Sequence, residues 1–428
     1  MTGHGPVLLA GGGIGGLVAA LCLHRAGHDV TVFEAVAEPR ELGVGINLLP
    51  HSVRVLDDLG LAGALAAEGV ETAELRFCSD DGVLIWSEGR GVAAGNPWPQ
   101  VSIHRGRLQM VLLEAVRATL GPDTVRTGRR LDAFEQDDDG VVARFVDRDG
   151  TEVATERGGV LVGCDGLHSA VRRHLVGADD PLHHSGLVLW RGAVELPPFL
   201  DGRTMLMAGH DRQKAVVYPI RGPRKPGGTV LTNWIVERPV AKAARGVGPA
   251  AVDWNAPVDP VAIARWFDDW DFGWIQMREV IAASDVAYEF PMVDRNPLDR
   301  WSHGRVTLLG DAAHPMRPNG SNGASQAVLD GEALATALTA HADPFTALAA
   351  YEAERREPTS CLVLANRQAG PERVMQWVAD RCDGRCGPDT GGRHVCVPDG
   401  DLAREANAYK ELAGFDLATL RGLAEERT

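Results

Sequence analysis

The chain has 428 residues, of which 45% are hydrophobic, and its formal net charge is −15. This length exceeds the size at which one hydrophobic core usually stops growing, so we expect two packed domains. The excess of 58 acidic over 43 basic residues disfavours nucleic acid and anionic membranes as partners. The apolar run at residues 7–23 is interrupted by glycines and follows no basic stretch, so it fits neither a signal peptide nor a membrane span. We therefore expect a cytoplasmic protein.

The first predicted unit is a strand, a glycine-rich turn, a helix and a second strand, which is the order of a dinucleotide-binding fold. The turn contributes the candidate nucleotide-binding residues Gly11, Gly13, Gly15 and Gly16. Gly11 permits a tight turn, Gly13 lets the backbone approach a pyrophosphate, and Gly16 lets the helix pack closely on the strand. Glu34 ends the second strand, where it can accept hydrogen bonds from ribose hydroxyls. An acidic residue at this position favours FAD or NAD over NADP.

Four further candidate nucleotide-binding residues follow predicted strands. Arg105 lies after a strand at residues 101–103 and begins a helix, where its guanidinium can reach a pyrophosphate or remain a surface charge. Asp165 follows a buried strand at residues 160–163. Gly310 and Asp311 follow another at residues 305–309. Because ligands of parallel sheets lie at the carboxyl ends of strands, both aspartates should point into one crevice, where Asp311 can hold ribityl hydroxyls.

A compact loop at residues 318–324 precedes a helix that starts near residue 325. It supplies the candidate flavin-binding residues Pro318, Gly323 and Ala324. The backbone N–H groups of such a loop and the helix dipole suit the electron-rich edge of an isoalloxazine ring. An ordinary helix start capped by Asn322 is the alternative.

The pattern changes between residues 181 and 296. Short alternating runs at residues 187–194, 204–208, 215–220 and 229–236 predict an antiparallel sheet laid over the flavin. Six of the ten tryptophans fall between Trp190 and Trp274, and they could line a pocket for a flat aromatic substrate. Trp266, Trp270 and Trp274 are four residues apart, which favours a helix packed on the sheet.

The motifs occur in a fixed order along the chain. They are GGGIGG with Glu34, HRGRL at residues 104–108, GCDGLHSAVRR at residues 163–173, and GDAAH with Pro318. This set resembles the FAD-dependent single-component aromatic hydroxylases of the para-hydroxybenzoate hydroxylase type. Motifs at residues 189–192, 218–220, 269–274 and 291–295 look like those of the 5-methylphenazine-1-carboxylate monooxygenase branch. The resemblance implies that Gly11, Gly13, Gly16, Glu34, Arg105 and Asp311 bind FAD, with Asp165 serving both FAD and the nicotinamide donor.

Together these features predict an α/β (α+β composite) fold in four parts. A Rossmann-like FAD-binding domain is expected at residues 1–180 and 297–345, a substrate domain with an antiparallel sheet at 181–296, and a C-terminal helical region at 346–428. No second strand-glycine-helix unit is visible in the sequence, so we expect NADPH or NADH to bind transiently.

The resemblance implies an FAD-dependent aromatic monooxygenase of secondary metabolism. NAD(P)H would reduce FAD, O2 would add to it, and a flavin C4a-hydroperoxide would hydroxylate a phenazine- or salicylate-like small molecule. Attack at a carbon that bears a carboxylate would also release CO2. The alternatives are a flavin-dependent reductase or oxidase of the same superfamily and a non-catalytic, flavin-binding redox sensor.

Three residues are candidates for contact with the substrate. Tyr218 either touches the substrate or packs beside its neighbouring proline. His314 either approaches the flavin or is satisfied within its own turn. Arg317, in a stretch expected to pass over the ring, either binds a substrate carboxylate bidentately or faces solvent. An arginine here departs from the apolar or aromatic residue typical of the family.

The C-terminal region is predicted to be helical at residues 330–340, 344–357, 359–381 and 402–412. These helices would pack on the FAD-binding domain or on a second subunit, so a monomer or a homodimer is expected. Between the last two lie Cys382, Cys386, His394 and Cys396. Their spacing is not that of common zinc modules, so we favour free thiols or a disulfide over a metal site.

Overall fold

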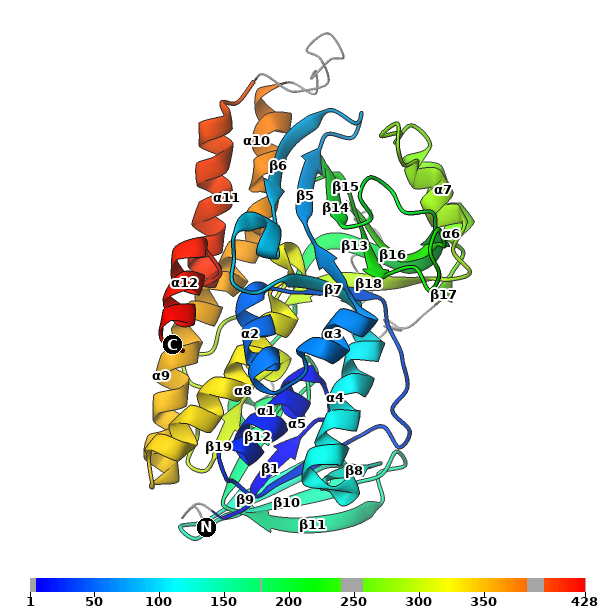
Figure 1. Cartoon of the computed structure of the whole chain (residues 1–428). Coiled ribbons are helices and arrows are strands. Elements are labelled where there is room, and N and C mark those ends of the chain that lie inside the picture. Colours follow the sequence, from blue (N-terminus) through cyan, green and yellow to red (C-terminus); the bar gives the residue numbers. More distant parts are fainter. Residues whose placement is uncertain (1–4, 178, 240–256, 383–395, 428) are drawn as a thin grey trace.

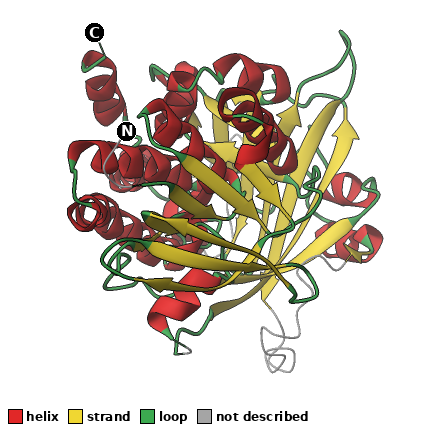
Figure 2. Ribbon diagram, turned by 90° about the horizontal axis from the view of Figure 1, so that it is seen from below, coloured by secondary structure: helices red, strands yellow, loops and turns green. Residues whose placement is uncertain are grey.

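The computed structural model of the chain describes residues 5–177, 179–239, 257–382 and 396–427 (Figure 1). Its strands run through the middle of the molecule and its helices lie around them (Figure 2). Among the described residues, no helix is long and apolar enough to cross a membrane.

The cofactor half is built on a parallel sheet in the order β19-β12-β1-β2-β8. Its strands are β1 (Val7–Ala10), β2 (Val30–Glu34), β8 (Val125–Thr127), β12 (Val160–Gly163) and β19 (Val306–Leu308). Around it lie α1 (Ile14–Arg25), α4 (Arg105–Leu120), α5 (Ala170–Val176) and α8 (Gly323–Ala340). Each residue of β1 is at most 2% exposed, as expected for a parallel strand that is covered on both faces.

Two smaller sheets flank this core. One is antiparallel and contains β9 (Arg130–Gln136), β10 (Val141–Val146) and β11 (Glu152–Gly158). The other contains β3 (Gly45–Leu48), β4 (Val70–Thr72) and β7 (Gln100–His104). Helices α2 (Pro50–Asp58) and α3 (Ala62–Glu68) lie between β3 and β4 in the sequence.

The second half is built on an eight-stranded sheet in the order β17-β18-β13-β16-β15-β14-β5-β6. Its strands are β5 (Glu74–Cys78), β6 (Leu84–Gly89), β13 (His183–Leu196), β14 (Thr204–His210), β15 (Gln213–Arg221), β16 (Val230–Pro239), β17 (Pro257–Val258) and β18 (Ala287–Asp294). Each of the four predicted runs forms a strand of this sheet. The strands β5 and β6 come from residues predicted for the FAD-binding domain, and β5 joins the sheet through a parallel pairing with β14.

The tryptophan spacing predicted a helix that does not form. Helix α6 (Pro260–Ala264) ends before Trp266, and α7 (Met277–Ala282) begins after Trp274. Trp270 is buried in the core against the sheet, whereas Trp266 is 42% exposed. The side chains therefore pack on the sheet from a short 3-10 turn and a loop.

The C-terminal helices lie along one side of the molecule, beside both large sheets (Figure 1). They are α9 (Pro344–Arg367), α10 (Arg373–Arg381), α11 (Asp399–Ala413) and α12 (Leu417–Glu425). The predicted break at residue 358 is wrong, because α9 continues through Pro358 and the chain turns at Ala369, which has a φ of 73°. Cys382 and Cys396 form a disulfide, whereas Cys386 and His394 lie outside the described residues.

Candidate active site

The glycine turn between β1 and α1 forms a tight corner with an open outer side. Gly11 has a φ of 126°, and a Cβ there would collide with the carbonyl oxygen of Cys164. A Cβ on Gly13, by contrast, would meet no atom within 4 Å. Gly13 and Gly15 line a cavity, while Gly16 packs against the backbone of Gly11. The turn therefore has the close packing and the open face that a bound pyrophosphate requires.

Glu34 lies beside this turn at the end of β2. One carboxylate oxygen accepts a hydrogen bond from the N–H of Gly12 at 2.8 Å, and the other accepts from the N–H of Val36 at 2.7 Å. These bonds fix the carboxylate next to the glycines. Since each oxygen can accept a further bond, the geometry is compatible with a ribose hydroxyl at this place.

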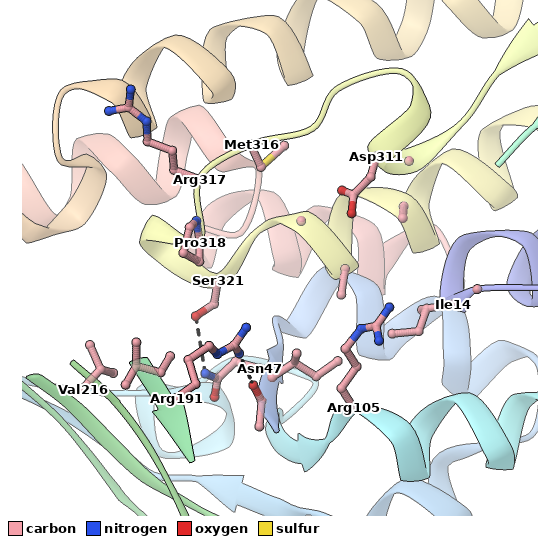
Figure 3. A pocket seen from close by; sticks show the side chains of 18 of the residues that line it. Ile14, Asn47, Arg105, Arg191, Val216, Asp311, Met316, Arg317, Pro318 and Ser321 are labelled. Carbon is pink, nitrogen blue, oxygen red and sulfur yellow. Dashed lines mark hydrogen bonds between the residues drawn. The ribbon is translucent and has the colours of Figure 1, made fainter. Parts of the chain in front are cut away.

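Arg105 and Asp311 enter the same cavity from opposite sides (Figure 3). Arg105 begins α4, and Asp311 follows β19. The side chain of Asp311 faces the cavity and is exposed to it, although protein surrounds the site. Desolvation by the surrounding protein raises the pKa of Asp311, while the charges of His314 and Arg105 lower it. A carboxylate placed here is suited to accept hydrogen bonds from hydroxyl groups of a ligand.

Asp165, unlike Arg105 and Asp311, is not among the residues that line the cavity. Its Oδ2 accepts a hydrogen bond from the N–H of Ala170 at 2.7 Å at the start of α5. Its Oδ1 is buried and has no hydrogen-bond partner among the described residues. Burial raises the pKa of this carboxyl. Its neighbours Cys164 and Gly166 line the cavity, so Asp165 lies just behind the wall.

The loop at residues 318–324 forms the opposite wall and is held by the C-terminal region. The cavity is lined there by Pro318, Ser321, Gly323 and Ala324, the last two in the first turn of α8. The hydroxyl of Tyr409 in α11 accepts a hydrogen bond from Asn322 and donates one to Asn366, each at 2.8 Å. A Cβ on Gly320 would collide with Tyr409. The C-terminal helices thus pack on the predicted flavin loop of their own chain.

The far end of the cavity is formed by the eight-stranded sheet. Met205 and Met207 of β14, Val216 of β15 and Ile235 of β16 give it an apolar surface. Tyr218 of β15 lines the same surface. Burial raises the pKa of Tyr218 to about 12, although the charge of Arg191 lowers it. Its hydroxyl is therefore protonated at neutral pH and available as a donor. The whole cavity has a volume of about 310 Å³.

Arg191 is a cavity residue that the sequence analysis did not single out. Its Nη2 donates to the carbonyl oxygen of Gly45 at 2.9 Å, and its guanidinium lies over the ring of Phe290. Its Nε is buried and has no partner among the described residues. Burial lowers its pKa. A guanidinium that lines the cavity and pairs with no carboxylate among the described residues is a candidate anion site.

Arg317 lines the cavity, but its side chain points away from Asp311 and Arg105 (Figure 3). Its Nε is 2.9 Å from Oδ2 of buried Asp294, which also pairs with Arg367 at 2.6 Å. His314 is not among the cavity-lining residues. Its Nε2 lies 2.6 Å from Oδ2 of buried Asp330, which also accepts the N–H of Gly310 at 2.9 Å. Of the three predicted substrate contacts, only Tyr218 therefore presents a free polar group to the cavity.

The donors and acceptors around the cavity fit a flavin dinucleotide. Gly13 leaves open space, Arg105 supplies a cation, and Asp311 supplies a carboxylate, all on one continuous surface. Comparison with known proteins also indicates an FAD-binding chain. A family model described as FAD binding domain matches residues 4–194 and 282–364.

Two curated relatives are similar over most of their length. Phenazine 1,6-dicarboxylic acid hydroxylase PhzS of Lysobacter antibioticus is 45% identical over 84% of this chain and 89% of its own. 3-Amino-4-hydroxybenzoate 2-monooxygenase PtmB3 of Streptomyces platensis is 36% identical over 88% and 91%. The solved structure of Klebsiella pneumoniae HpxO with FAD and uric acid has a TM-score of 0.70 at 24% identity, covers 99% of this chain and 97% of its own, and shows the fold alone.

Proposed function

The chain belongs to the FAD-dependent aromatic hydroxylases, and we propose that its substrate is a planar, polycyclic aromatic acid of the phenazine class. The observation that carries the proposal is the continuity of the cavity. Residues suited to the cofactor, such as Arg105 and Asp311, line the same space as the apolar sheet surface at Val216 and Ile235. A flat apolar molecule on that surface would lie beside the cofactor. The similarity to a phenazine dicarboxylic acid hydroxylase supports this substrate class.

We assign the cofactor contacts to the residues around the glycine turn and the loop after β19. The turn at Gly11 and Gly13 and the side chain of Arg105 would hold the pyrophosphate, Glu34 would hold the ribose, and Asp311 would hold the ribityl chain. The first turn of α8, with Gly323 and Ala324, lines the cavity and would face the flavin ring. When bound and reduced by NAD(P)H, FAD supplies the activation of O2 for transfer of one oxygen atom to an electron-rich ring.

The protein itself positions the substrate and keeps water away. The apolar side chains of the sheet surface bury the faces of the aromatic ring system. Arg191 binds its carboxylate, and the protonated hydroxyl of Tyr218 donates a second hydrogen bond at the same end. Holding the reacting carbon in a dry, fixed position favours transfer of oxygen to the ring over its release in water. Where the attacked carbon carries the carboxylate, hydroxylation is accompanied by loss of CO2.

In this proposal His314 and Arg317 do not contact the substrate but position other groups around the cavity. His314 fixes Asp330, which in turn holds the backbone N–H of Gly310 next to Asp311. Arg317 ties the stretch before Pro318 to Asp294 at the end of β18. Both are positioning residues, because neither presents a free polar group to the cavity.

The test is consumption of NADPH and of NADH by the purified holoenzyme. A panel of phenazine, salicylate and other polycyclic aromatic acids would be offered, and the product masses read. We expect phenazine acids to stimulate consumption and to gain one oxygen, with or without loss of CO2. Consumption that no aromatic acid accelerates, or that leaves every compound unchanged, would instead favour a reductase or oxidase.

A further inference from the structure

A disulfide links the end of α10 to the start of α11. Cys382 follows α10 directly and is 8% exposed, whereas Cys396 lies just before α11 and is partly exposed. Their Cα atoms are 5.8 Å apart, and 14 positions separate them in the sequence. The bond is the one covalent cross-link among the described residues, whose other cysteines are the free thiols Cys22, Cys78, Cys164 and Cys361.

The two helices belong to the layer that packs behind the cavity, and they lie side by side (Figure 1). They share one apolar cluster with the cavity surface of the sheet, to which α10 contributes Val374, Met375 and Val378 and α11 contributes Leu402 and Ala406. At the start of α10, Nε of Arg373 lies 3.0 Å from Oε1 of Glu405 in α11. An ion pair thus joins the helices near one end of α10, and the disulfide joins them at the other.

Each helix also supports the loop at residues 318–324, which is the proposed flavin loop. Glu372, directly before α10, accepts a hydrogen bond from Nδ2 of Asn319 at 2.6 Å. The hydroxyl of Tyr409 in α11 accepts one from Asn322 at 2.8 Å. The loop lines the cavity between these two contacts. A movement of α10 relative to α11 would therefore reach the cavity through this loop.

A reduced thiol pair at this place has a balanced route to the disulfide. The thiolate of Cys396, the more exposed of the two, attacks hydrogen peroxide; the O–O bond breaks, and the released hydroxide takes up the thiol proton as water. The thiol of Cys382 then attacks the resulting sulfenic acid, so that the S–S bond forms and a second water leaves. Two thiols thus give two electrons to one peroxide, and a dithiol or glutathione reverses the step.

We propose that Cys382 and Cys396 form a reversible oxidation site, whose disulfide fixes α10 against α11 and so strengthens the binding of FAD. In the dithiol form the end of α10 is released from α11, and the flavin loop loses the joint support of its two contacts. The oxidant is hydrogen peroxide, which a flavin hydroxylase releases when reduced oxygen is not transferred to a ring. The proposal rests on the placement of FAD beside residues 318–324 and is independent of the substrate.

The affinity of the oxidised and the reduced full-length protein for FAD tests the proposal. Apoprotein is treated with hydrogen peroxide or with a phosphine reductant, freed of reagent under nitrogen and titrated with FAD, while peptide mapping after alkylation reports the state of Cys382 and Cys396. We expect the reduced form to bind FAD at least about fivefold more weakly, as for a small coupling free energy between two sites, and peroxide to restore the affinity. Equal affinity in the two forms would overturn the proposal, whereas absence of FAD binding in both would contradict the placement of the cofactor.

Variants separate control of the cofactor from simple stabilisation. Cys382→Ser combined with Cys396→Ser should bind FAD like the reduced wild type and be insensitive to both reagents. Cys361→Ser, which removes a partly exposed thiol of α9, is the matched control and should respond as the wild type does. In Tyr409→Phe the two forms should differ less, because one of the two contacts with the loop is already lost. A lower melting temperature on reduction without any change in FAD affinity would show that the bond only stabilises the helices, and the proposal would then be wrong.

Discussion

Exchanging Arg191 and Arg317 separately for methionine distinguishes which arginine binds the substrate carboxylate. Both line the cavity. Arg317 is neutralised by buried Asp294, whereas the guanidinium of Arg191 donates a hydrogen bond to the carbonyl oxygen of Gly45 and makes no ion pair among the described residues. Methionine replaces the apolar stem of each arginine but not its guanidinium, so each variant loses one positive charge and the hydrogen bonds that the guanidinium makes.

The size of the expected effect follows from the charge of Arg191. A hydrogen bond to a charged group contributes about 1.5–3 kcal/mol. Each factor of ten in affinity corresponds to about 1.4 kcal/mol. Arg191→Met should therefore weaken binding of a carboxylate ligand roughly 10- to 100-fold. Arg317→Met should leave that affinity nearly unchanged and lower the free energy of unfolding, because it removes one of the two arginines that neutralise Asp294.

The assay is the ratio of dissociation constants for phenazine-1-carboxylate and unsubstituted phenazine, measured on the FAD-loaded proteins. This ratio cancels changes in packing that affect both ligands. Arg191→Lys is the matched control, since it retains the charge but loses the planar guanidinium. The reasoning is refuted if Arg317→Met abolishes the preference for the acid and Arg191→Met preserves it.

Three further predictions concern the cofactor cradle and its support. Gly13→Ala should keep a normal melting temperature, because the added Cβ enters open space, yet it should lose FAD affinity, because that space is the proposed pyrophosphate site. Gly11→Ala should also destabilise the apoprotein, because its Cβ would collide with the backbone of Cys164. FAD titration and thermal unfolding compare the two variants. Tyr409→Phe should lower the free energy of unfolding by about 1–2 kcal/mol and weaken FAD retention, with Tyr288→Phe in β18 as control. Burial raises the pKa of Asp330, but its two basic partners lower it to about 2, below the ordinary 3.8. Its stabilisation, on the order of 2 kcal/mol, is therefore complete above about pH 4 and lost as pH falls towards 2, so urea unfolding of Asp330→Asn and the wild type should converge over that range.

Local patterns were sufficient to predict the cofactor half. The strand, glycine turn and helix at residues 7–25 are adjacent in the sequence, and their spacing alone specifies the corner at Gly11. Asp311 was identifiable because it directly follows a buried strand. The four main strands of the substrate sheet were also predicted, because their alternation is local.

Pairings between distant segments could not be read from the sequence. The parallel contact of β5 with β14 joins residues 130 positions apart in the register, such as Glu74 and Thr204. The direction of Arg317 depends on Asp294, and the burial of His314 depends on Asp330. The ion pairs of Lys214 join it to Glu237 on the neighbouring strand β16 and to Glu372 in a turn of the C-terminal region. Arg191 lay within a recognised motif, but only the face of β13 shows that its side chain enters the cavity.

The most direct test of the central claim is the reaction of the FAD-loaded enzyme with NAD(P)H, phenazine-1-carboxylate and isotopically heavy dioxygen. The account predicts that the product ring gains one heavy oxygen atom as NAD(P)H is consumed. Rapid consumption of NAD(P)H with the phenazine recovered unlabelled would contradict it.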